Sequence, residues 1–290
     1  MTPPAYRARF RRILDHVDQN LGGDLAVDRL ADLAGFSRFH FHRQFSATFG
    51  IGVHEYVRLA RLRRASFELA FRGDSSVLRV ALENGYESPE GFSRAFKKLA
   101  GQTPTEFRQE PDWTAVRDAL RPFDHVRREM NTRTQYGPVT LVDFPETPVA
   151  VLQHRGDPRT IGDTIRRFIE WRRANGLPPS ASATYNLLYG DPETTPPEEF
   201  RLDLCAGIRA PVAENSYGVV ESVIPAGRCA VLRLVGGDEQ FAPAFQFLYG
   251  EWLPASGHEL RDFPLFLQRV KMFPDVPENE SVIDVFLPLS

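Results

Sequence analysis

The sequence predicts two regions of different class, an all-α N-terminal region and an α+β C-terminal region. Two internal repeats carry this prediction. The first region repeats itself after about fifty residues and the second after about eighty. Apolar residues of the first repeat recur at helical spacing, whereas copies of the second begin with short apolar runs typical of strands. At 290 residues, the chain is long enough for two domains with separate cores.

The front repeat predicts two helix-turn-helix units. The first part of each unit aligns at a shift of 50, which pairs Val27, Leu30, Ala31 and Gly35 with Val77, Val80, Ala81 and Gly85. The second part aligns at a shift of 51, from Ser37 with Ser88 to Tyr56 with Phe107. A one-residue insertion in a helix rotates everything after it, so we place the extra residue in the turn that follows the glycine.

Turn and capping residues mark the ends of these helices. Gly35 stands where a left-handed C-cap is needed, and Ser37 and Ser88 are placed as N-caps of the second helices. Thr103–Glu106 reads as a capping box with proline at the first helical position. The phenylalanines at helical spacing are interpreted as core: Phe41, Phe45, Phe49, Phe92 and Phe96.

A segment without glycine or proline, Glu55–Phe71, joins the two units and predicts one helix of about 25 Å. A rod of this length can hold two recognition helices in successive major grooves, which lie roughly 34 Å apart. It carries four arginines that either approach phosphates or are ordinary solvated side chains: Arg58, Arg61, Arg63 and Arg64.

The polar face of each second helix is the candidate DNA-binding surface. Arg43 and Arg94 occupy equivalent repeat positions, and arginine is a common donor to guanine edges and phosphates. Residues 1–108 hold 17 basic against 12 acidic residues, while the remainder holds 18 against 26. The alternative is an ordinary solvated helix face. The candidate contacts with double-stranded DNA are Arg38, Phe39, His42, Arg43, Ser46, Glu90, Ser93, Arg94 and Lys97.

The front region resembles the DNA-binding domain of the AraC/XylS family of transcription regulators. Leu33–Phe45 resembles the first motif of that family, and Asn84–Lys98 followed by Gly101–Arg108 resembles its second half. The resemblance implies that Phe39, His42 and Arg43 approach DNA. In one branch of the family a polar neutral residue stands at the position of Glu90, which can accept from cytosine N4 but repels a phosphate.

The back repeat predicts two strand-helix-strand copies with a mainly antiparallel sheet. Ala150–Leu152 aligns with Ala230–Leu232 at a shift of 80, and Trp171 aligns with Trp252 at a shift of 81. We expect helices over Thr160–Asn175 and Gln240–Leu253. Further strands are expected over Leu202–Ile208, Gly218–Ile224 and Val282–Leu287.

Residues 138–288 resemble the GyrI-like effector-binding domain. The resembling stretches are Leu187–Pro192, Ile224–Val231, Glu251–Gly257 and Ile283–Leu289. The resemblance implies a groove lined by aromatic residues that receives cationic or aromatic compounds. For each single aromatic residue, core packing is the alternative. The candidate ligand-binding residues are Trp171, Tyr185, Tyr189, Glu221, Phe245, Trp252 and Phe266.

One departure from that family concerns the charge of the effector. A glutamate that meets a ligand cation in the family corresponds to Leu267 here, and Gln268 and Arg269 follow it. Its absence indicates a neutral or differently charged effector.

The predicted domains are a DNA-binding domain over 1–110, a linker with some helix over 111–136, and an effector-binding domain over 137–290. No phosphate loop, paired-cysteine metal pattern or nucleophile elbow is found, so no catalytic residue, metal or cofactor is expected. We expect a cytoplasmic regulator with reduced cysteines and no membrane partner, and RNA polymerase is a further candidate partner. Whether the protein is an activator or a repressor stays open. The alternatives are a hydrolase of reactive small molecules fused to a DNA-binding head, and a constitutive regulator whose back half binds proteins.

Overall fold

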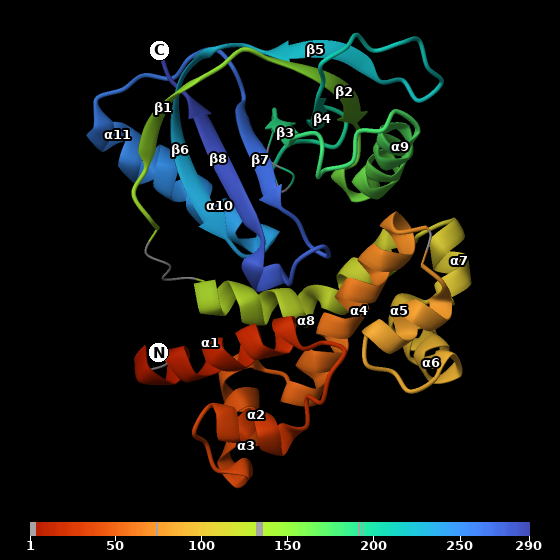
Figure 1. The fold of residues 1–290 in the computed structure, drawn as a ribbon. Helices are drawn as coiled ribbons and strands as arrows, with labels where there is room; N and C mark the ends of the chain where they lie inside the picture. The colour runs from red at the N-terminus through yellow and green to blue at the C-terminus, as the bar shows by residue number, and fades with distance from the viewer. Residues whose placement is uncertain (1–3, 74, 132–135, 191, 193) are drawn as a thin grey trace. The chain divides into compact units, whose positions relative to one another are not determined.

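The computed structural model describes residues 4–73, 75–131, 136–190, 192 and 194–290, and the chain divides into two compact units (Figure 1). The helical unit comprises Met1–Thr134 and Pro277–Asn279, and the sheet unit comprises Gln135–Val276 and Glu280–Ser290. This confirms the predicted fold class of an all-α region followed by an α+β region.

The helical unit contains the two predicted helix-turn-helix units, formed by α2–α3 and α5–α6. The turn in the first spans residues 34–37 and that in the second spans 84–88, so the extra residue lies in the turn as predicted. Gly35 and Gly85 adopt φ of 64° and 73°, a region that glycine enters without a steric penalty. The helices are α1 (Pro4–Gln19), α2 (Val27–Leu33), α3 (Arg38–Phe49), α4 (Val53–Phe71), α5 (Val77–Glu83), α6 (Pro89–Ala100), α7 (Pro104–Gln109) and α8 (Trp113–Asn131).

The predicted helix caps are formed with one difference. The Ser88 hydroxyl accepts a hydrogen bond from the backbone N–H of Gly91 at 3.1 Å, and Thr103 and Glu106 form both bonds of the capping box. Ser37 stands at the N-cap of α3, but its side chain makes no capping bond. The first unit therefore starts its second helix without the side-chain bond that the second unit has.

Helix α8 occupies most of the segment expected as a linker. Val116, Leu120 and Phe123 on α8 are buried in the same core as the phenylalanines of α3 and α6. The rings of Phe123 and Tyr56 stack with centroids 5.0 Å apart. The helix expected over Asp112–Met130 is thus packed into the helical unit, while residues 132–135 of that segment lie outside the described residues.

The sheet unit is built on one eight-stranded antiparallel sheet in the order β1-β6-β8-β7-β3-β4-β2-β5. Helix α9 and the helical segment that begins with α10 occupy equivalent places in the two halves. The elements are β1 (Thr140–Phe144), β2 (Thr147–Arg155), α9 (Ile161–Ala174), β3 (Thr184–Leu188), β4 (Arg201–Gly207), β5 (Val220–Ile224), β6 (Gly227–Val235), α10 (Phe241–Phe247), α11 (Leu253–Ser256), β7 (Leu265–Lys271) and β8 (Val282–Pro288).

The two halves exchange their first strands. Strand β1 belongs to the first half but pairs with β6 of the second, and β5 of the second half pairs with β2 of the first. The remaining strands of the halves meet at β3 and β7, where Asn186 lies opposite Leu267. Each half therefore completes the sheet of the other, so that neither can form its full set of strands alone.

The repeat shift changes inside the second helical segment. Strands β1 and β2 align with β5 and β6 at a shift of 80, whereas β3 and β4 begin 81 residues before β7 and β8. Helix α9 is α-helical throughout, but a π-helical turn over Leu248–Trp252 joins α10 to α11. A π turn accommodates one additional residue in a helix. The extra residue thus lies in this turn, and the phase of the apolar face is preserved on either side.

We predict that deletion of Gly250, the exposed middle residue of the π turn, lowers the free energy of unfolding by less than about 1 kcal/mol, because it restores the α-helical repeat. Deletion of exposed Glu170 in α9 should instead cost about 3–5 kcal/mol, because it turns the buried Trp171 by about 100°. Urea unfolding followed by circular dichroism measures both. Equal losses for the two deletions would contradict the assignment.

Candidate nucleic-acid interface and effector site

Helices α3 and α6 each present one polar face and bury the other. Phe41 and Phe45 of α3 are fully buried, as are Phe92 and Phe96 of α6. The opposite faces carry the predicted DNA contacts. His42, Arg43, Glu90, Arg94 and Lys97 are exposed, and Ser46 and Ser93 are half-buried. The apolar stripe fixes the rotation of each helix, so these side chains point to solvent.

Two predicted contacts lie at the start of α3. The backbone of Arg38 and Phe39 forms the first turn of this helix, but their side chains lie outside what the structure describes.

The turn between α3 and α4 brings His42 and Ser46 close to Gly52. A Cβ atom at Gly52 would lie 3.3 Å from Nε2 of His42 and 3.9 Å from Oγ of Ser46. The ring of His42 therefore rests against the backbone at the start of the connecting helix.

The four arginines of connecting helix α4 all bind protein groups. Arg58 donates to Glu55, and Arg64 donates to Glu68. Arg61 donates to the carbonyl oxygens of Leu21 and Gly23 at 3.0 and 3.2 Å. Arg63 donates to Glu278. Arg61 and Arg63 thus bind groups outside α4, a use that neither sequence-based alternative included, whereas Arg58 and Arg64 bind acids of α4 itself.

A buried carboxylate connects α4 to the second helix-turn-helix unit. The side chain of Glu68 is 1% exposed and accepts from Arg64 Nε at 2.9 Å and from Asn84 Nδ2 at 2.7 Å. Asn84 is fully buried at the end of α5 and also donates to the Val80 carbonyl oxygen at 2.8 Å. Because an unpaired buried charge is costly, the turn of the second unit is held at a fixed place on α4.

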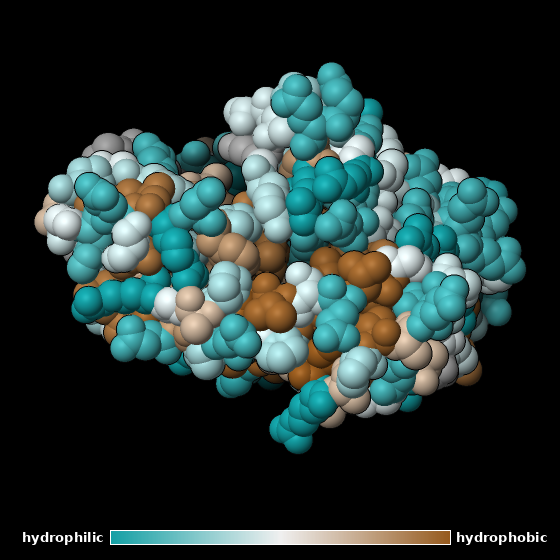
Figure 2. All heavy atoms as spheres, turned by 90° about the horizontal axis from the view of Figure 1, so that it is seen from above, coloured by the Kyte–Doolittle hydropathy of each residue, from teal (hydrophilic) through white to brown (hydrophobic). Residues whose placement is uncertain are grey.

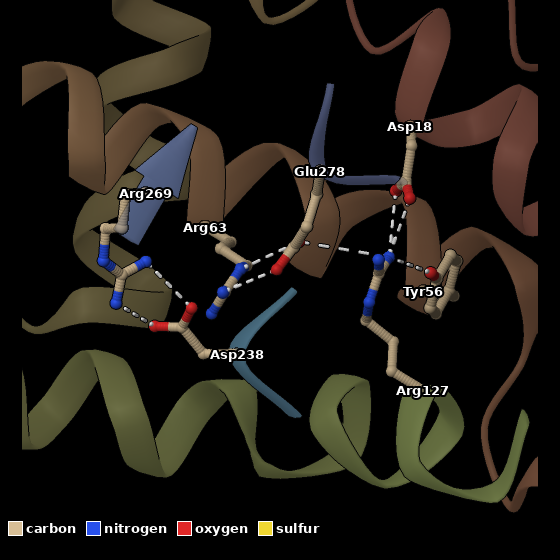
Figure 3. A network of polar contacts seen from close by, with 7 residues as sticks. All are labelled: Asp18, Tyr56, Arg63, Arg127, Asp238, Arg269 and Glu278. Carbon is tan, nitrogen blue, oxygen red and sulfur yellow. Dashed lines mark hydrogen bonds and ion pairs between the residues drawn. The ribbon is translucent and has the colours of Figure 1, made fainter. Parts of the chain in front are cut away.

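Near the start of the connecting helix, Tyr56 lies beside a buried ion pair between α1 and α8. Arg127 of α8 donates to both carboxylate oxygens of Asp18 at 3.1 and 2.8 Å, and to the hydroxyl of Tyr56 at 3.4 Å (Figure 3). Burial raises the pKa of Asp18 to about 6, and the positive charge of Arg127 opposes this rise. The pair ties the first and last helices of the unit to α4.

The predicted ligand-binding residues of the sheet unit divide between the two faces of the sheet. Trp171 is buried on α9, where it stacks on Phe168 of the same helix. Phe245 of α10 and Trp252 of the π turn pack on the core cluster of the second half. Tyr185 and Phe266 lie on the opposite face, because successive strand residues alternate in direction. The structure therefore brings Tyr185 and Phe266 together, with ring centroids 6.4 Å apart, but does not join them to the tryptophans.

The remaining two candidates lie at the surface. Tyr189 is 43% exposed, and the guanidinium of Arg201 lies 3.8 Å from its ring centroid. Glu221 is exposed on edge strand β5 and accepts from the backbone N–H of Val212 at 3.1 Å. Both side chains thus have protein partners of their own.

Leu267, at the position of the family glutamate, is buried on the face that carries α10. The nearest polar groups in the register are Asn186, opposite it, and Arg269, two residues further along β7. Arg269 Nε donates to Oδ1 of Asn186 at 2.9 Å. Its other nitrogens donate to Asp238 at 3.0 and 3.2 Å (Figure 3). The place where the two halves meet thus carries an arginine and an amide.

Apolar groups are also exposed on the surface. Figure 2 shows one face on which brown hydrophobic patches lie among teal hydrophilic residues. Large hydrophobic residues that are exposed in the sheet unit include Leu141, Val220, Val223, Tyr249 and Leu260. Edge strands β1 and β5 contribute three of them, Leu141, Val220 and Val223.

Metal-binding and reactive groups are sparse in the part of the chain that the structure describes. No group of three or more histidine, cysteine or acidic side chains is arranged to hold a metal ion there. Cys205 and Cys229 are buried, and burial raises the pKa of both thiols, which keeps them protonated. None of the described helices is sufficiently long and apolar to cross a membrane.

The two regions match two known families. Residues 137–290 match the GyrI-like small molecule binding domain, and residues 30–110 match a helix-turn-helix domain. These matches confirm the resemblances drawn from the sequence.

Individual relatives cover parts of the chain. A protein of Escherichia coli K12 named probable transcriptional regulator YgiV is 37% identical over 153 residues, which are 52% of this chain and 96% of that protein. The right origin-binding protein of the same strain is 32% identical over 136 residues, 47% of this chain and 45% of that protein. The cryo-EM structure of an EcmrR–DNA complex covers 88% of this chain and 85% of its own at 12% identity, with a TM-score of 0.45.

We predict that Glu68→Ala lowers the free energy of unfolding by about 3–5 kcal/mol, because buried Asn84 and the guanidinium of Arg64 lose their common acceptor. The matched control is Glu83→Ala, which removes the acid of the exposed i,i+4 pair with Arg79 and should cost less than about 1 kcal/mol. Urea unfolding of the two variants measures both losses. A Glu68→Ala loss as small as that of the control would show that the buried acid does not position α4.

Proposed function

The chain belongs to the GyrI-like small-molecule-binding family and carries a helix-turn-helix domain ahead of that region, and we propose that it is a DNA-binding transcription regulator controlled by a small molecule. One observation carries this proposal. Arg43 and Arg94 are exposed at equivalent positions of two helices whose other faces are buried in one core. Matched basic faces at a fixed spacing suit a duplex read in two places.

The proposed DNA interface uses α3 and α6 as recognition helices. Helix α4 has 19 residues and is therefore about 28 Å long, which suits successive major grooves roughly 34 Å apart. Arg43 and Arg94 would donate to guanine edges or phosphates, while Glu90 would accept from a cytosine. The further contacts proposed are Arg38, Phe39, His42, Ser46, Ser93 and Lys97.

The proposed effector is a small aromatic or hydrophobic molecule without a positive charge. Support comes from Leu267, which stands where the family places an acid, and from Arg269 beside it. The charge of Arg269 is balanced by Asp238, so this place, with Leu267 instead of an acid, offers no unbalanced negative charge to attract a cation. The proposed ligand-binding residues are Trp171, Tyr185, Tyr189, Glu221, Phe245, Trp252 and Phe266.

The proposed partners follow from these two roles. They are double-stranded DNA, the effector and, if the protein activates transcription, RNA polymerase. A relative named probable transcriptional regulator supports this assignment.

We predict that Arg43→Ala and Arg94→Ala each weaken specific DNA binding by about 1–3 kcal/mol, because each removes a charged donor from a recognition helix. An operator selected by the parent protein from random duplexes, followed by titration at fixed salt, measures the loss. Arg121→Ala is the control, since this exposed arginine on α8 pairs with Asp118 outside both helix-turn-helix units. If both recognition-helix variants bound the operator like the parent, the assignment of α3 and α6 would fail.

We predict that neutral aromatic compounds and aromatic carboxylates raise the melting temperature, whereas tetraphenylphosphonium does not. A ligand at about 100 times its Kd stabilises the folded state by about 2.7 kcal/mol. Arg269→Gln should abolish the response to the carboxylates but keep that to neutral compounds. Arg233→Gln is the control, because this arginine forms a comparable pair with Asp284.

A response to the phosphonium cation alone would contradict the proposed charge. Consumption of a stabilising compound during incubation would contradict a purely regulatory role.

A further inference from the structure

A three-residue segment, Pro277–Asn279, belongs to the helical unit although it is far from the other residues of that unit in sequence. Strand β7 ends at Lys271 before it and β8 begins at Val282 after it, and both strands are in the middle of the sheet. Five residues separate the segment from β7 and two separate it from β8. A displacement of either strand is therefore transmitted to the segment through the backbone.

Glu278 is the residue of the segment that binds the helices. Its side chain is 5% exposed and receives a two-bond salt bridge from Arg63 of α4 (Figure 3). Arg63 Nε donates to Oε2 at 3.0 Å and its terminal nitrogen donates to Oε1 at 2.7 Å. This parallel geometry is the strongest that an arginine and a carboxylate form, and it fixes direction as well as distance.

The bridge is part of a larger buried cluster. Oε2 of Glu278 lies 4.0 Å from Arg127, which also binds Asp18. The cluster therefore joins α1, α4 and α8 to the segment, and within it two carboxylates face two guanidinium groups. Arg63 also lies over the rings of Phe67 and Phe123, at 5.5 and 5.9 Å from their centroids. Removing one negative charge from such a cluster disturbs all of its members.

The partner of Glu278 is on the helix that sets the spacing of the recognition helices. Arg61 on the same helix holds the loop after α1, and Glu68 holds the second helix-turn-helix unit. A displacement of Arg63 thus acts on α4, the helix to which both helix-turn-helix units are fixed.

We propose that Glu278 is a positioning residue that couples DNA binding by the helical unit to the state of strands β7 and β8. This inference rests on the proposed function, since it concerns the regulation of the same DNA-binding site. Coupling of this kind is reciprocal, so DNA binding must also change the stability of β7 and β8. The unidentified effector is therefore not needed to test it.

The test is hydrogen exchange of the full-length protein with and without a duplex selected by the parent protein. In the parent, the duplex changes amide exchange over 272–288. In Glu278→Gln, which keeps the shape but removes the charge, the change falls by more than half while the duplex is still bound. The matched control is Glu280→Gln, two residues further on and exposed, which behaves like the parent.

Two outcomes overturn the inference. One is an exchange rate over 272–288 that the duplex leaves unchanged in the parent. The other is a Glu278→Gln variant that melts at a lower temperature but keeps the full exchange response, since this is the behaviour of a residue with a structural role alone.

A second measurement does not depend on DNA. Urea unfolding followed residue by residue by hydrogen exchange reports whether β8 and α4 open together. We expect a common midpoint in the parent and in Glu280→Gln, and separate midpoints in Glu278→Gln. If no duplex is selected, the proposed function fails, but this measurement still tests the coupling. Separate midpoints for β8 and α4 in the parent protein would refute the coupling.

Discussion

The buried bond between Glu68 and Asn84 is the constraint on which the arrangement of the helical unit depends. A carboxylate that is 1% exposed must keep its donors, so α4 and the turn of the second helix-turn-helix unit cannot separate without a large cost. Arg61 fixes the loop before the first unit to the same helix through two carbonyl oxygens. The spacing of two surfaces at the ends of the unit is thus determined in its interior.

The sheet unit is held together by different contacts. Its two halves are joined by exchanged edge strands, and the charged residues buried in it include Arg172, Asp203 and Asp284. Pairing β1 with β6 and β5 with β2 gives each half a strand that the other encodes, so the halves form as one cooperative sheet.

Much of this architecture follows from the sequence, because aligned residues of two repeat copies occupy equivalent positions in the fold. The shifts of 50 and 51 located both helix-turn-helix units and the longer turn, and the shifts of 80 and 81 located the two halves of the sheet unit. Repeats do not state which face a side chain occupies. The aromatic candidates of the sheet unit therefore lie on two faces, with Tyr185 and Trp171 in different clusters. The sequence also does not predict that Arg61 binds Gly23 or that Arg63 binds Glu278, since these partners are 38 and 215 residues away along the chain.

The two repeats also show how the same one-residue difference is absorbed in different places. In the helical unit it lengthens a turn, where the chain changes direction and no buried face depends on the phase. In the sheet unit it lies within a helix, and the π turn over Leu248–Trp252 keeps Leu248 buried on one side and Trp252 against the same cluster on the other. Whether the apolar face of a helix is buried on both sides of an extra residue thus determines whether that residue lies in a turn or in a π turn. A turn suffices where the apolar face ends, and a π turn is required where the face continues.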